Sequence, residues 1–540
     1  MTSPIAITAP SLRALLATDA EYAVIDVRET GVHSRDGHIL RSVSLPLSRL
    51  EVRVATLIPR LSTEIVIYDE GSETLARRAA IRLAELGYHN TRILAGGIRA
   101  WKDAGYEVFT GTNVLGKAFG EVVEHQDGTP HVTVQELKAK LDAGENVVVL
   151  DSRPVPEFRN FSLPGALDLP GAELVHRFHQ AVPDPDTLVV VNCAGRTRSI
   201  IGAQALINAG VPNRVVSLAN GTMDWLLAGW TLEHGREATV PPPEGEALEA
   251  ATRAAARLRQ RFGLQVIDHA TLERFCAEAD RTLYLIDVRT PREHAAGHPD
   301  GALPAPGGQL VQQTGDWIGT QNGRIVLVDD ANGVRAAITA SWLAQINWGE
   351  VFILDNALSL DPVIGVQPAR LAAPLPEVRT IAPGALAGLL AGAGATLLDL
   401  QPSPGYEAGH IAGARFAIRA WLQSQAQVPG DGAIVLTSED GALAAFAAAD
   451  LAPTGPREVF ALAGGNAAWR AAGLTFTAEP ADRLHPAEDV WRSPYHQPDP
   501  HAAFREYLAW EIGLVEQVER DGTARFRRFP PLARAREAAE

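Results

Sequence analysis

The segment A-V-I-D-V-R at Ala23–Arg28 recurs, with small changes, at three later places in the chain. Its counterparts are V-V-L-D-S-R at Val148–Arg153, L-I-D-V-R at Leu285–Arg289 and L-L-D-L at Leu397–Leu400. Each contains a short apolar run that leads into an aspartate, a pattern typical of a buried parallel strand. A self-similar pattern of this kind predicts a chain built from four copies of one structural unit.

Further elements follow in the same order in the copies. A second apolar strand is predicted at Glu64–Tyr68, Leu188–Asn192, Arg324–Val328 and Ala433–Thr437. A polar loop, an Ala-rich helical stretch and a third strand come next, and three copies then place a tryptophan after a turn, as at Leu94–Trp101. Strands that alternate with helices predict an α/β fold, in which each unit is a mainly parallel sheet flanked by helices.

Polar and proline-rich stretches separate the copies and set the predicted boundaries. The predicted units are a first domain at 1–112, a second at 113–240, a helical spacer at 241–262, a third domain at 263–362, a fourth at 376–480 and a C-terminal appendage at 481–540. Glu246–Arg261 is predicted to be a capped surface helix that divides the protein into two pairs of domains. A fragment that ends near Glu237 is therefore expected to fold alone and to retain the chemistry of the first two copies.

The C-terminal appendage has an amphipathic helical pattern in Phe504, Tyr507, Leu508 and Ile512. Asp521-Gly522, with alternating residues on both sides, predicts a hairpin after this helix. The favoured interpretation is a packing element rather than a functional site.

The composition is that of a folded protein with several domains. The 540 residues are 46% hydrophobic and 21% charged, and the chain is too long for one core. A formal net charge of −16 argues against nucleic acid or an anionic membrane as a partner. The sequence contains no recognisable secretory signal and no apolar run of roughly 20 residues. Since two cysteines in such a chain also fit a reducing compartment, we predict a soluble, cytoplasmic protein.

One strand-to-helix loop carries a nucleophile, within V-V-V-N-C-A-G-R-T-R-S at Val189–Ser199. Cys193 stands at the carboxyl end of a predicted parallel strand and just before a helix, where open sheets present ligands. Backbone amides and the helix dipole favour the thiolate there, and Arg196 and Arg198 add positive charge. We expect these groups to lower the thiol pKa from about 8.5 and to make Cys193 a nucleophile near neutral pH.

The other three copies lack a cysteine at the matching position. They carry Asp69, Asp329 and Ser438 instead. A carboxylate cannot take the part of a thiolate, and a serine without an evident base is a poor nucleophile. These three domains are predicted to be inactive, and a role as scaffold and interface is favoured over a second activity.

Three copies also have a Gly-His element, at Gly37-His38-Ile39, Gly297-His298-Pro299 and Gly409-His410-Ile411. The cysteine loop, together with the repeated D-V-R, G-H-I and G-G-x-x-x-W elements, resembles the rhodanese family of sulfurtransferases from about Ala6 to Thr477. The resemblance implies that Cys193 attacks the sulfane sulfur of a donor, carries it as a persulfide and passes it to a thiophilic acceptor. It also implies that an inactive first domain packs beside the active second one.

By the same resemblance, the residues that bind the substrate are those of the loop: Ala194, Gly195, Arg196, Thr197, Arg198 and Ser199. Their main-chain amides would hold the persulfide, and the two arginines would bind a small anionic donor such as thiosulfate. The acceptor would be a thiol or a cyanide-like nucleophile, including a protein thiol. Many relatives have glycine where this chain has Arg196, and the second copy lacks the Gly-His element, having Phe161-Ser162-Leu163 there.

Two other functions compete with sulfur transfer. Cysteine-dependent phosphatases also use a cysteine, a loop of amides and an arginine, but their arginine lies six positions after the cysteine, whereas Arg198 lies five after Cys193. The shorter loop suits a single sulfur atom better than a phosphate group. A persulfide sensor, or a sulfur-delivery scaffold whose inactive domains bind partners, stays open as an alternative.

The remaining chemically versatile residues have plainer interpretations. Asp151 and Arg153 are predicted to support the site as a structural ion pair. Cys276 lies on an apolar helical face with Leu272 and Phe275 and is predicted to be a buried structural thiol. The histidines of the Gly-His elements are predicted to be hydrogen-bonded turn residues. No metal-ligand spacing or phosphate-binding glycine loop is present, so neither a metal nor a cofactor is predicted.

Overall fold

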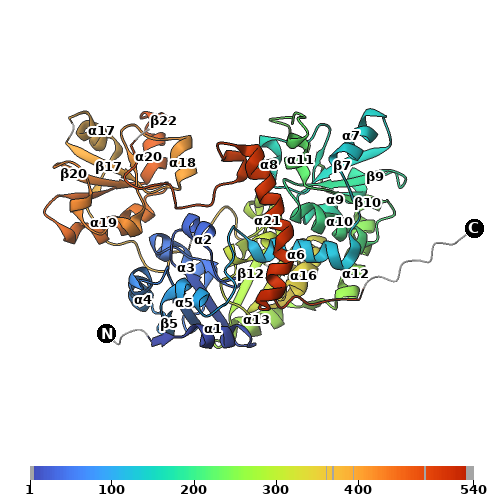
Figure 1. Ribbon diagram of the computed structural model, residues 1–540, viewed down its shortest axis with the longest axis horizontal. Helices are drawn as coiled ribbons and strands as arrows, with labels where there is room; N and C mark the ends of the chain where they lie inside the picture. The colour runs from blue at the N-terminus through green and yellow to red at the C-terminus, as the bar shows by residue number, and fades with distance from the viewer. Residues whose placement is uncertain (1–4, 360–361, 368–369, 393, 480–481, 531–540) are drawn as a thin grey trace, which may run out of the picture.

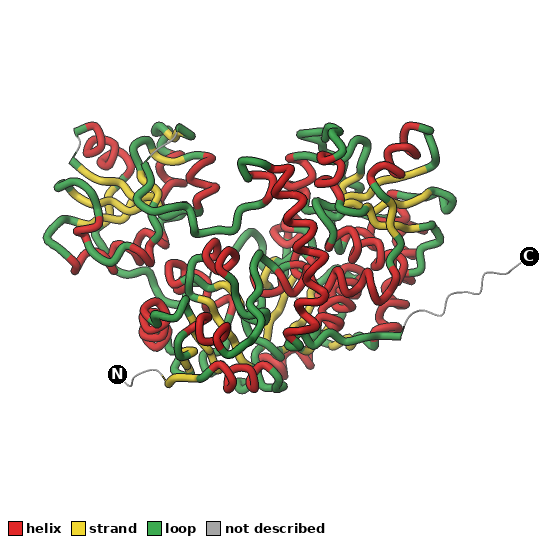
Figure 2. Tube along the Cα trace, in the orientation of Figure 1, coloured by secondary structure: helices red, strands yellow, loops and turns green. Residues whose placement is uncertain are grey.

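The computed structural model describes residues 5–359, 362–367, 370–392, 394–479 and 482–530 (Figure 1). The boundary that we predicted between the fourth domain and the C-terminal appendage, at 480–481, lies outside the described residues. Four α/β domains follow one another along the chain (Figure 2).

Each domain has five strands in one sheet. The strands of the first domain are β1 (Ile5–Ile7), β2 (Tyr22–Asp26), β3 (Val43–Ser44), β4 (Glu64–Tyr68) and β5 (Thr91–Leu94). Those of the second are β6 (His131–Val132), β7 (Val147–Asp151), β8 (Leu167–Asp168), β9 (Leu188–Asn192) and β10 (Val215–Leu218). Those of the third are β11 (Gln265–Ile267), β12 (Leu283–Asp287), β13 (Leu303–Pro304), β14 (Arg324–Val328) and β15 (Glu350–Leu354). Those of the fourth are β16 (Thr380–Ile381), β17 (Ala395–Asp399), β19 (Arg415–Phe416), β20 (Ala433–Thr437) and β21 (Val459–Leu462), beside a separate antiparallel pair of β18 (His410–Ile411) and β22 (Phe476–Thr477).

Helices connect these strands and link the domains. The first domain has α1 (Ala9–Leu16), α2 (Thr30–Asp36), α3 (Leu50–Leu57), α4 (Thr74–Glu85) and α5 (Gly97–Asp103), and α6 (Val114–Val123) leads to the second. The second has α7 (Val134–Asp142), α8 (Val155–Asn160), α9 (Glu173–Ala181), α10 (Thr197–Ala209) and α11 (Gly221–Leu227), and α12 (Gly245–Phe262) leads to the third. The third has α13 (His269–Ala277), α14 (Pro291–Ala296), α15 (Gly307–Gln312) and α16 (Val334–Ile346). The fourth has α17 (Pro383–Ala391), α18 (Ser403–Ala408), α19 (Ala442–Leu451) and α20 (Gly465–Ala471), and α21 (Pro500–Asp521) lies in the C-terminal segment.

All four sheets have the same strand order, which confirms the predicted fold class. In the second domain this order is β6-β10-β9-β7-β8, and every adjacent pair is parallel. β4, β9, β14 and β20 are therefore the central strands of their sheets. Each is almost wholly apolar and buried, because helices on both faces remove its side chains from water. The carboxyl end of each central strand opens into a loop that leads to a helix, which gives four equivalent positions for a functional loop.

The first three domains share one core, so the predicted division into two pairs of domains is wrong. A single group of buried apolar side chains includes Ile67 of β4, Val191 of β9 and Leu327 of β14. α12 lies in contact with α9 and α16, with Ala255 and Leu258 buried. The spacer helix is exposed along one face, as predicted, but its other face joins the second domain to the third instead of separating them. A fragment that ends near Glu237 would expose this face of the second domain to water, which argues against its folding and working alone.

The fourth domain has hydrophobic groups of its own and is joined to the first domain by charged contacts. Buried Arg419 donates through Nη2 to Glu51 Oε1 of α3 at 2.8 Å. Arg82 of α4 binds both Glu51 and Asp450 of α19. In Figure 1 this domain, in orange, stands apart from the second domain, in green and teal.

The C-terminal segment crosses the molecule and ends differently from our prediction. α21 packs against α6 and α11, and it lies in red between the first and second domains in Figure 1. Gly522 has a φ of +64° and ends this helix, and residues 522–530 contain no strand. The predicted hairpin is absent there because Asp521-Gly522 is a helix terminus with a left-handed glycine, a conformation that also occurs in hairpin turns.

Candidate active site

Cys193 lies where the sequence predicts it, directly after β9 and four residues before α10 begins at Thr197. Only 2% of the residue is exposed. The carbonyl oxygen of Cys193 accepts a hydrogen bond from the Thr222 amide at 3.0 Å. Gly221 has a φ of +52°, and a Cβ atom there would stand 2.2 Å from the Cys193 oxygen. The close approach of the α11 turn to the cysteine loop therefore requires glycine at this position.

Burial raises the pKa of the Cys193 thiol, against the opposing effects of Arg198 and of hydrogen bonds from Ser199. The charge of Glu511 raises it further. Our expectation of a lowered thiol pKa is therefore wrong for the closed site described here. The sequence pointed to the helix terminus and the arginines, but it could not show the loss of water around the sulfur or the carboxylate that approaches from a distant segment.

Both arginines of the loop are already bound to carboxylates. Arg196 donates through Nε to Glu121 Oε1 of α6 at 2.7 Å and through Nη1 to Asn220 Oδ1 at 3.1 Å, and it also binds Glu124. Arg198 donates from both terminal nitrogens to Glu157 of α8, at 2.8 and 2.9 Å. Arg196 thus fastens the loop to the helix that precedes the second domain. Arg198 is the arginine whose charge acts on Cys193, and it stays a predicted donor ligand.

The supporting residues hold the strand ends below the loop. Arg153 donates through Nη2 to Asp151 Oδ2 at 2.8 Å, and both side chains are fully buried. Asn192, the residue before the cysteine, donates through Nδ2 to the same carboxylate oxygen at 2.8 Å. Ser199 donates its hydroxyl to the carbonyl oxygen of Arg196 at 2.7 Å, which closes the first turn of α10. These contacts fix the position of the loop on β9.

The C-terminal segment completes the site, and sequence reasoning missed this. Glu511 of α21 accepts from the Thr197 hydroxyl at 3.0 Å and from the Tyr507 hydroxyl at 3.2 Å, through Oε1 in both cases. Tyr495, in the short 3-10 helix η8 (Pro494–His496), donates to the carbonyl oxygen of Ala194 at 3.3 Å. A Cβ atom on Gly195 would lie 3.2 Å from Glu511 Oε2. The appendage is thus part of the wall around the cysteine loop rather than packing alone.

A weak signal for this role was present in the sequence. Tyr507 and Glu511 are four residues apart and share the buried face of α21 with Phe504 and Leu508. A glutamate on the apolar face of a helix indicates a polar partner elsewhere in the fold. Ile512, which the sequence pattern placed on the apolar face, is exposed.

The equivalent loops of the other domains are closed by their own side chains. Asp69 Oδ1 accepts from the amides of Gly71 and Glu73, at 2.9 and 3.1 Å, and Oδ2 accepts from Ala76. Ser438 Oγ accepts from the Ala444 amide at 3.3 Å. In these two loops the side chain at the cysteine position occupies backbone donors.

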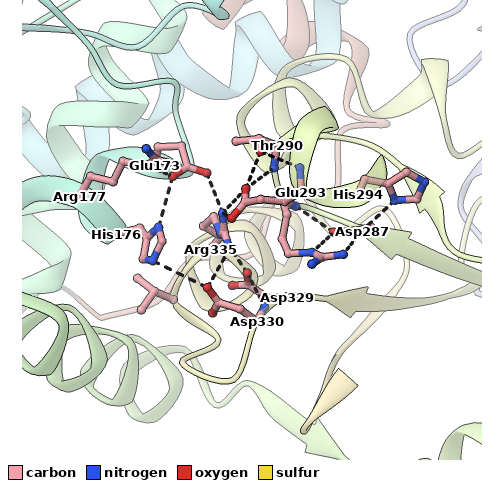
Figure 3. Close-up of polar contacts among 12 residues, drawn as sticks. Glu173, His176, Arg177, Asp287, Thr290, Glu293, His294, Asp329, Asp330 and Arg335 are labelled. Carbon is pink, nitrogen blue, oxygen red and sulfur yellow. Dashed lines mark hydrogen bonds and ion pairs between the residues drawn. The ribbon is translucent and has the colours of Figure 1, made fainter. Parts of the chain in front are cut away.

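The loop of the third domain is an ion-pair network (Figure 3). Asp329 Oδ2 accepts from the Ala336 amide at 3.0 Å, and Oδ1 accepts from Arg335 Nε at 2.9 Å. Arg335, which is fully buried, also contacts Asp330, Glu293 and Glu173. Glu173 belongs to α9 of the second domain, where it also binds His176 and Arg177. This loop therefore anchors the third domain to the second.

Cys276 is exposed on α13, so our prediction of a buried thiol is wrong. Leu272 is the residue of this short helix that is buried, and Phe275 is half-buried. A single turn of apolar spacing predicted the face of the helix without showing how far the core extends along it.

The histidines of the Gly-His elements are buried. Nδ1 of His298 lies 2.8 Å from the carbonyl oxygen of His294, and Nδ1 of His410 lies 2.8 Å from that of Tyr406. Within the described parts of the chain, no group of three or more His, Cys, Asp or Glu side chains is placed to hold a metal ion. The described helices include none that is long and apolar enough to cross a membrane.

Comparisons with known proteins agree with this architecture. A family model, Rhodanese-like domain, matches residues 8–104, 133–228, 270–359 and 382–472. A crystal structure of thiosulfate sulfurtransferase from Pseudomonas aeruginosa superimposes with a TM-score of 0.93 and 42% sequence identity, and the match covers 97% of this chain and 100% of that one.

Two curated proteins match shorter parts of the chain. The 3-mercaptopyruvate sulfurtransferase of Escherichia coli (strain K12) is 25% identical over 273 residues, which are 41% of this chain and 92% of that protein. An HTH-type transcriptional regulator of Mycobacterium tuberculosis is 32% identical over 110 residues, 20% of this chain, and the chain spans about half the length of that regulator, 47%.

The fold, the cysteine loop and these relatives support an enzyme of the sulfurtransferase class. The chain belongs to the rhodanese-like domain family, whose model it matches four times.

Proposed function

We propose that the protein moves sulfane sulfur from a small anionic donor, such as thiosulfate, to a thiophilic acceptor through a persulfide on Cys193. The observation that carries the proposal is the placement of Cys193 at the end of a central strand, where the equivalent loops carry Asp69, Asp329 and Ser438. The thiosulfate sulfurtransferase of Pseudomonas aeruginosa supports this donor class by its resemblance over the whole chain.

The two steps of the transfer balance without a cofactor. The Cys193 thiolate attacks the outer sulfur of thiosulfate, the sulfur–sulfur bond breaks, and sulfite leaves with the bonding electron pair. The acceptor then attacks the outer sulfur of the persulfide, and the Cys193 thiolate leaves. Amides of Ala194 to Ser199 would stabilise the anionic persulfide at the start of α10, because free N–H groups at a helix N-terminus favour negative charge.

Access to the sulfur requires movement of the C-terminal segment. Cys193 is 2% exposed, and Tyr495, Leu508 and Glu511 stand against its loop. We infer that this segment moves outward when the donor enters and covers the persulfide afterwards, which would protect it from water and from unselective thiols. The acceptor, a thiol or a cyanide-like nucleophile, would enter by the same route.

We infer that the first, third and fourth domains are inactive scaffold. Their side chains at the cysteine position cannot hold a transferable sulfur, and the loop of the third domain is engaged in binding the second. The two free cysteines and the acidic charge are consistent with a cytoplasmic enzyme.

Mass mapping after incubation with thiosulfate tests the proposal. We expect one added sulfur atom on the peptide that contains Cys193, because this thiol lies among the loop amides and close to Arg198. Cys193→Ser should abolish thiocyanate formation from thiosulfate and cyanide. The matched control is Cys276→Ser, which should retain full activity because Cys276 is exposed on α13, outside the site. A persulfide on Cys276, or turnover in Cys193→Ser, would refute the assignment.

A further inference from the structure

Lys117 of α6 is a buried lysine beside the catalytic loop. The residue is 3% exposed, and its Nζ stands over three aromatic rings, at 5.2 Å from the centroid of Trp491 and at 4.8 Å from those of Tyr507 and Trp510. All three rings belong to the C-terminal segment. The ammonium thus sits in an aromatic cage that closes when α21 packs on α6.

The ammonium has no counter-ion in the part of the chain that the structure describes. Glu511 is the carboxylate whose charge acts on it most, yet the two groups form no ion pair there. Cation–π contacts offset part of the cost of burying an ammonium, but an unpaired buried charge stays unfavourable until an anion joins it. By contrast, Arg196 and Arg198 are neutralised by Glu121, Glu124 and Glu157. Lys117 is therefore the cation near the site whose charge is not compensated in this way.

Lys117 lies in the same wall as the residues that touch the cysteine loop. Gly120, almost one turn further along α6, packs so closely on Thr197 that a Cβ atom would stand 2.8 Å from Thr197 Cγ2. Tyr507, a ring of the cage, binds Glu511, which in turn binds Thr197. The charge of Arg198 also acts on Lys117. These contacts place the ammonium one side-chain layer from the loop.

Neither α6 nor the C-terminal segment falls in the four ranges that the family model matches. The cage and its lysine therefore lie outside the rhodanese-like domains as the family model defines them. A property of the family as a whole therefore does not account for them.

We propose that Lys117 determines donor specificity, by supplying the counter-charge for the anionic part of the sulfur donor when the C-terminal segment moves outward. This inference rests on the proposed function of Cys193. With thiosulfate, the ammonium faces the three oxygens of the sulfite part, and it stabilises the charge that this group gains as the sulfur–sulfur bond breaks. In the empty enzyme the aromatic cage holds the ammonium in place.

The test measures thiosulfate binding by titration calorimetry in the full-length Cys193→Ser protein, in which no sulfur is transferred. Adding Lys117→Met, which keeps the length of the side chain and removes its charge, should weaken binding about tenfold or more. Lys117→Arg should stay within about threefold of the parent, because the cation remains. Lys138→Met, a surface lysine of the same domain, is the control and should change nothing. Equal affinity with methionine and lysine at position 117 would overturn the proposal.

A second measurement does not depend on the folding of the methionine variant. Burial lowers the pKa of Lys117 to about 8, so in Cys193→Ser the affinity for thiosulfate should fall as the pH rises through and above this value. The other charged or titratable groups near the ammonium are Glu511 and Tyr507 of α21, Arg198 of α10 and Glu121 of its own helix. Burial raises the pKa of Tyr507 well above the range of the titration. Affinity that stays constant from about pH 7 to 9 would also overturn the proposal.

In the enzyme that keeps Cys193, a comparison of two sulfur donors distinguishes the role of Lys117 from the proposed function. We expect Lys117→Met to lower kcat/KM for thiosulfate about tenfold and to leave kcat/KM for a small alkyl hydropersulfide, which has no sulfite group and releases an alkyl thiolate, within about twofold. A persulfide on Cys193 with equal losses for both donors would refute the role of Lys117 and leave the proposed function intact. Absence of any persulfide on Cys193 would refute the proposed function itself.

Discussion

The loops after β9 and β14 hold side chains of opposite character at the same place in the fold. In the second domain the position is a thiol, Cys193, with Arg198 nearby. In the third domain it is a carboxylate, Asp329, which accepts from the loop amides of Asp330 and Ala336 at 2.8 and 3.0 Å. The carboxylate occupies the donors that an anionic sulfur would need. At this position the third domain therefore binds its own chain through a carboxylate, where the second domain has a thiol.

The arginines of the two loops differ in the same way. Arg198 binds one carboxylate, Glu157, whose side chain is 42% exposed. Arg335 donates to four carboxylates, one of which, Glu173, comes from the second domain. The first arginine is held at the edge of a site, whereas the second joins two domains (Figure 3). The loop that has a carboxylate at the cysteine position is thus the one used for domain packing.

The largest effect is expected when the nucleophile is moved from the loop of the second domain to that of the third. Cys193→Ser should lower transfer by at least about a thousandfold, and adding Asp329→Cys should not restore it. Burial and the charge of Asp330, which raise the pKa of the carboxyl group at this position, would also disfavour a thiolate there, and Arg335 shares its charge with three other carboxylates. Thiocyanate formation measures the outcome. Restored turnover would mean that the position in the fold is sufficient, and that the surroundings of the loop matter little.

A smaller difference is expected in stability, when Arg335 and Arg198 are each replaced. Arg335→Met should lower the free energy of unfolding by about 3–5 kcal/mol, because it leaves the buried carboxylates of Asp329 and Glu173 without this cation. Arg198→Met should cost about 1 kcal/mol or less, because Glu157 remains partly hydrated. Urea unfolding followed by tryptophan fluorescence compares the variants. Equal losses would show that both loops are structural.

The smallest effect concerns the thiol pKa. Glu511→Gln removes a negative charge that raises the pKa of Cys193, so this pKa should fall by up to about one unit. The thiolate fraction below the pKa would rise, and alkylation of Cys193 by iodoacetamide at neutral pH should become faster by up to about tenfold. Glu519→Gln, on the exposed side of α21, is the control and should leave the rate unchanged. An unchanged or slower rate in Glu511→Gln would show that Glu511 does not act on the sulfur.

Local pattern was enough to predict the four parallel sheets and the position of Cys193. Segments such as Val148–Arg153 can be recognised as containing strands, because a strand covered on both faces must be apolar along its length. The cysteine at the end of the central strand follows from the same reasoning, since parallel strands expose their carboxyl ends to ligands. These features depend on residues that are neighbours in the chain.

Other outcomes depended on residues far apart in the chain, and the sequence could not decide them. α12 has a polar face and looks like a surface helix, yet α9 and α16 cover its alanines. The pKa of Cys193 is set by burial and by Glu511, which lies 318 positions later in the numbering and reaches the loop through Thr197. Electrostatic effects act through space and grow as water is excluded, so only the tertiary structure shows which charges meet. The residue pattern alone was sufficient to predict the repeated fold and its single cysteine loop. The environment of the sulfur depends on the packing of α6 and α21 over that loop, which only the tertiary structure shows.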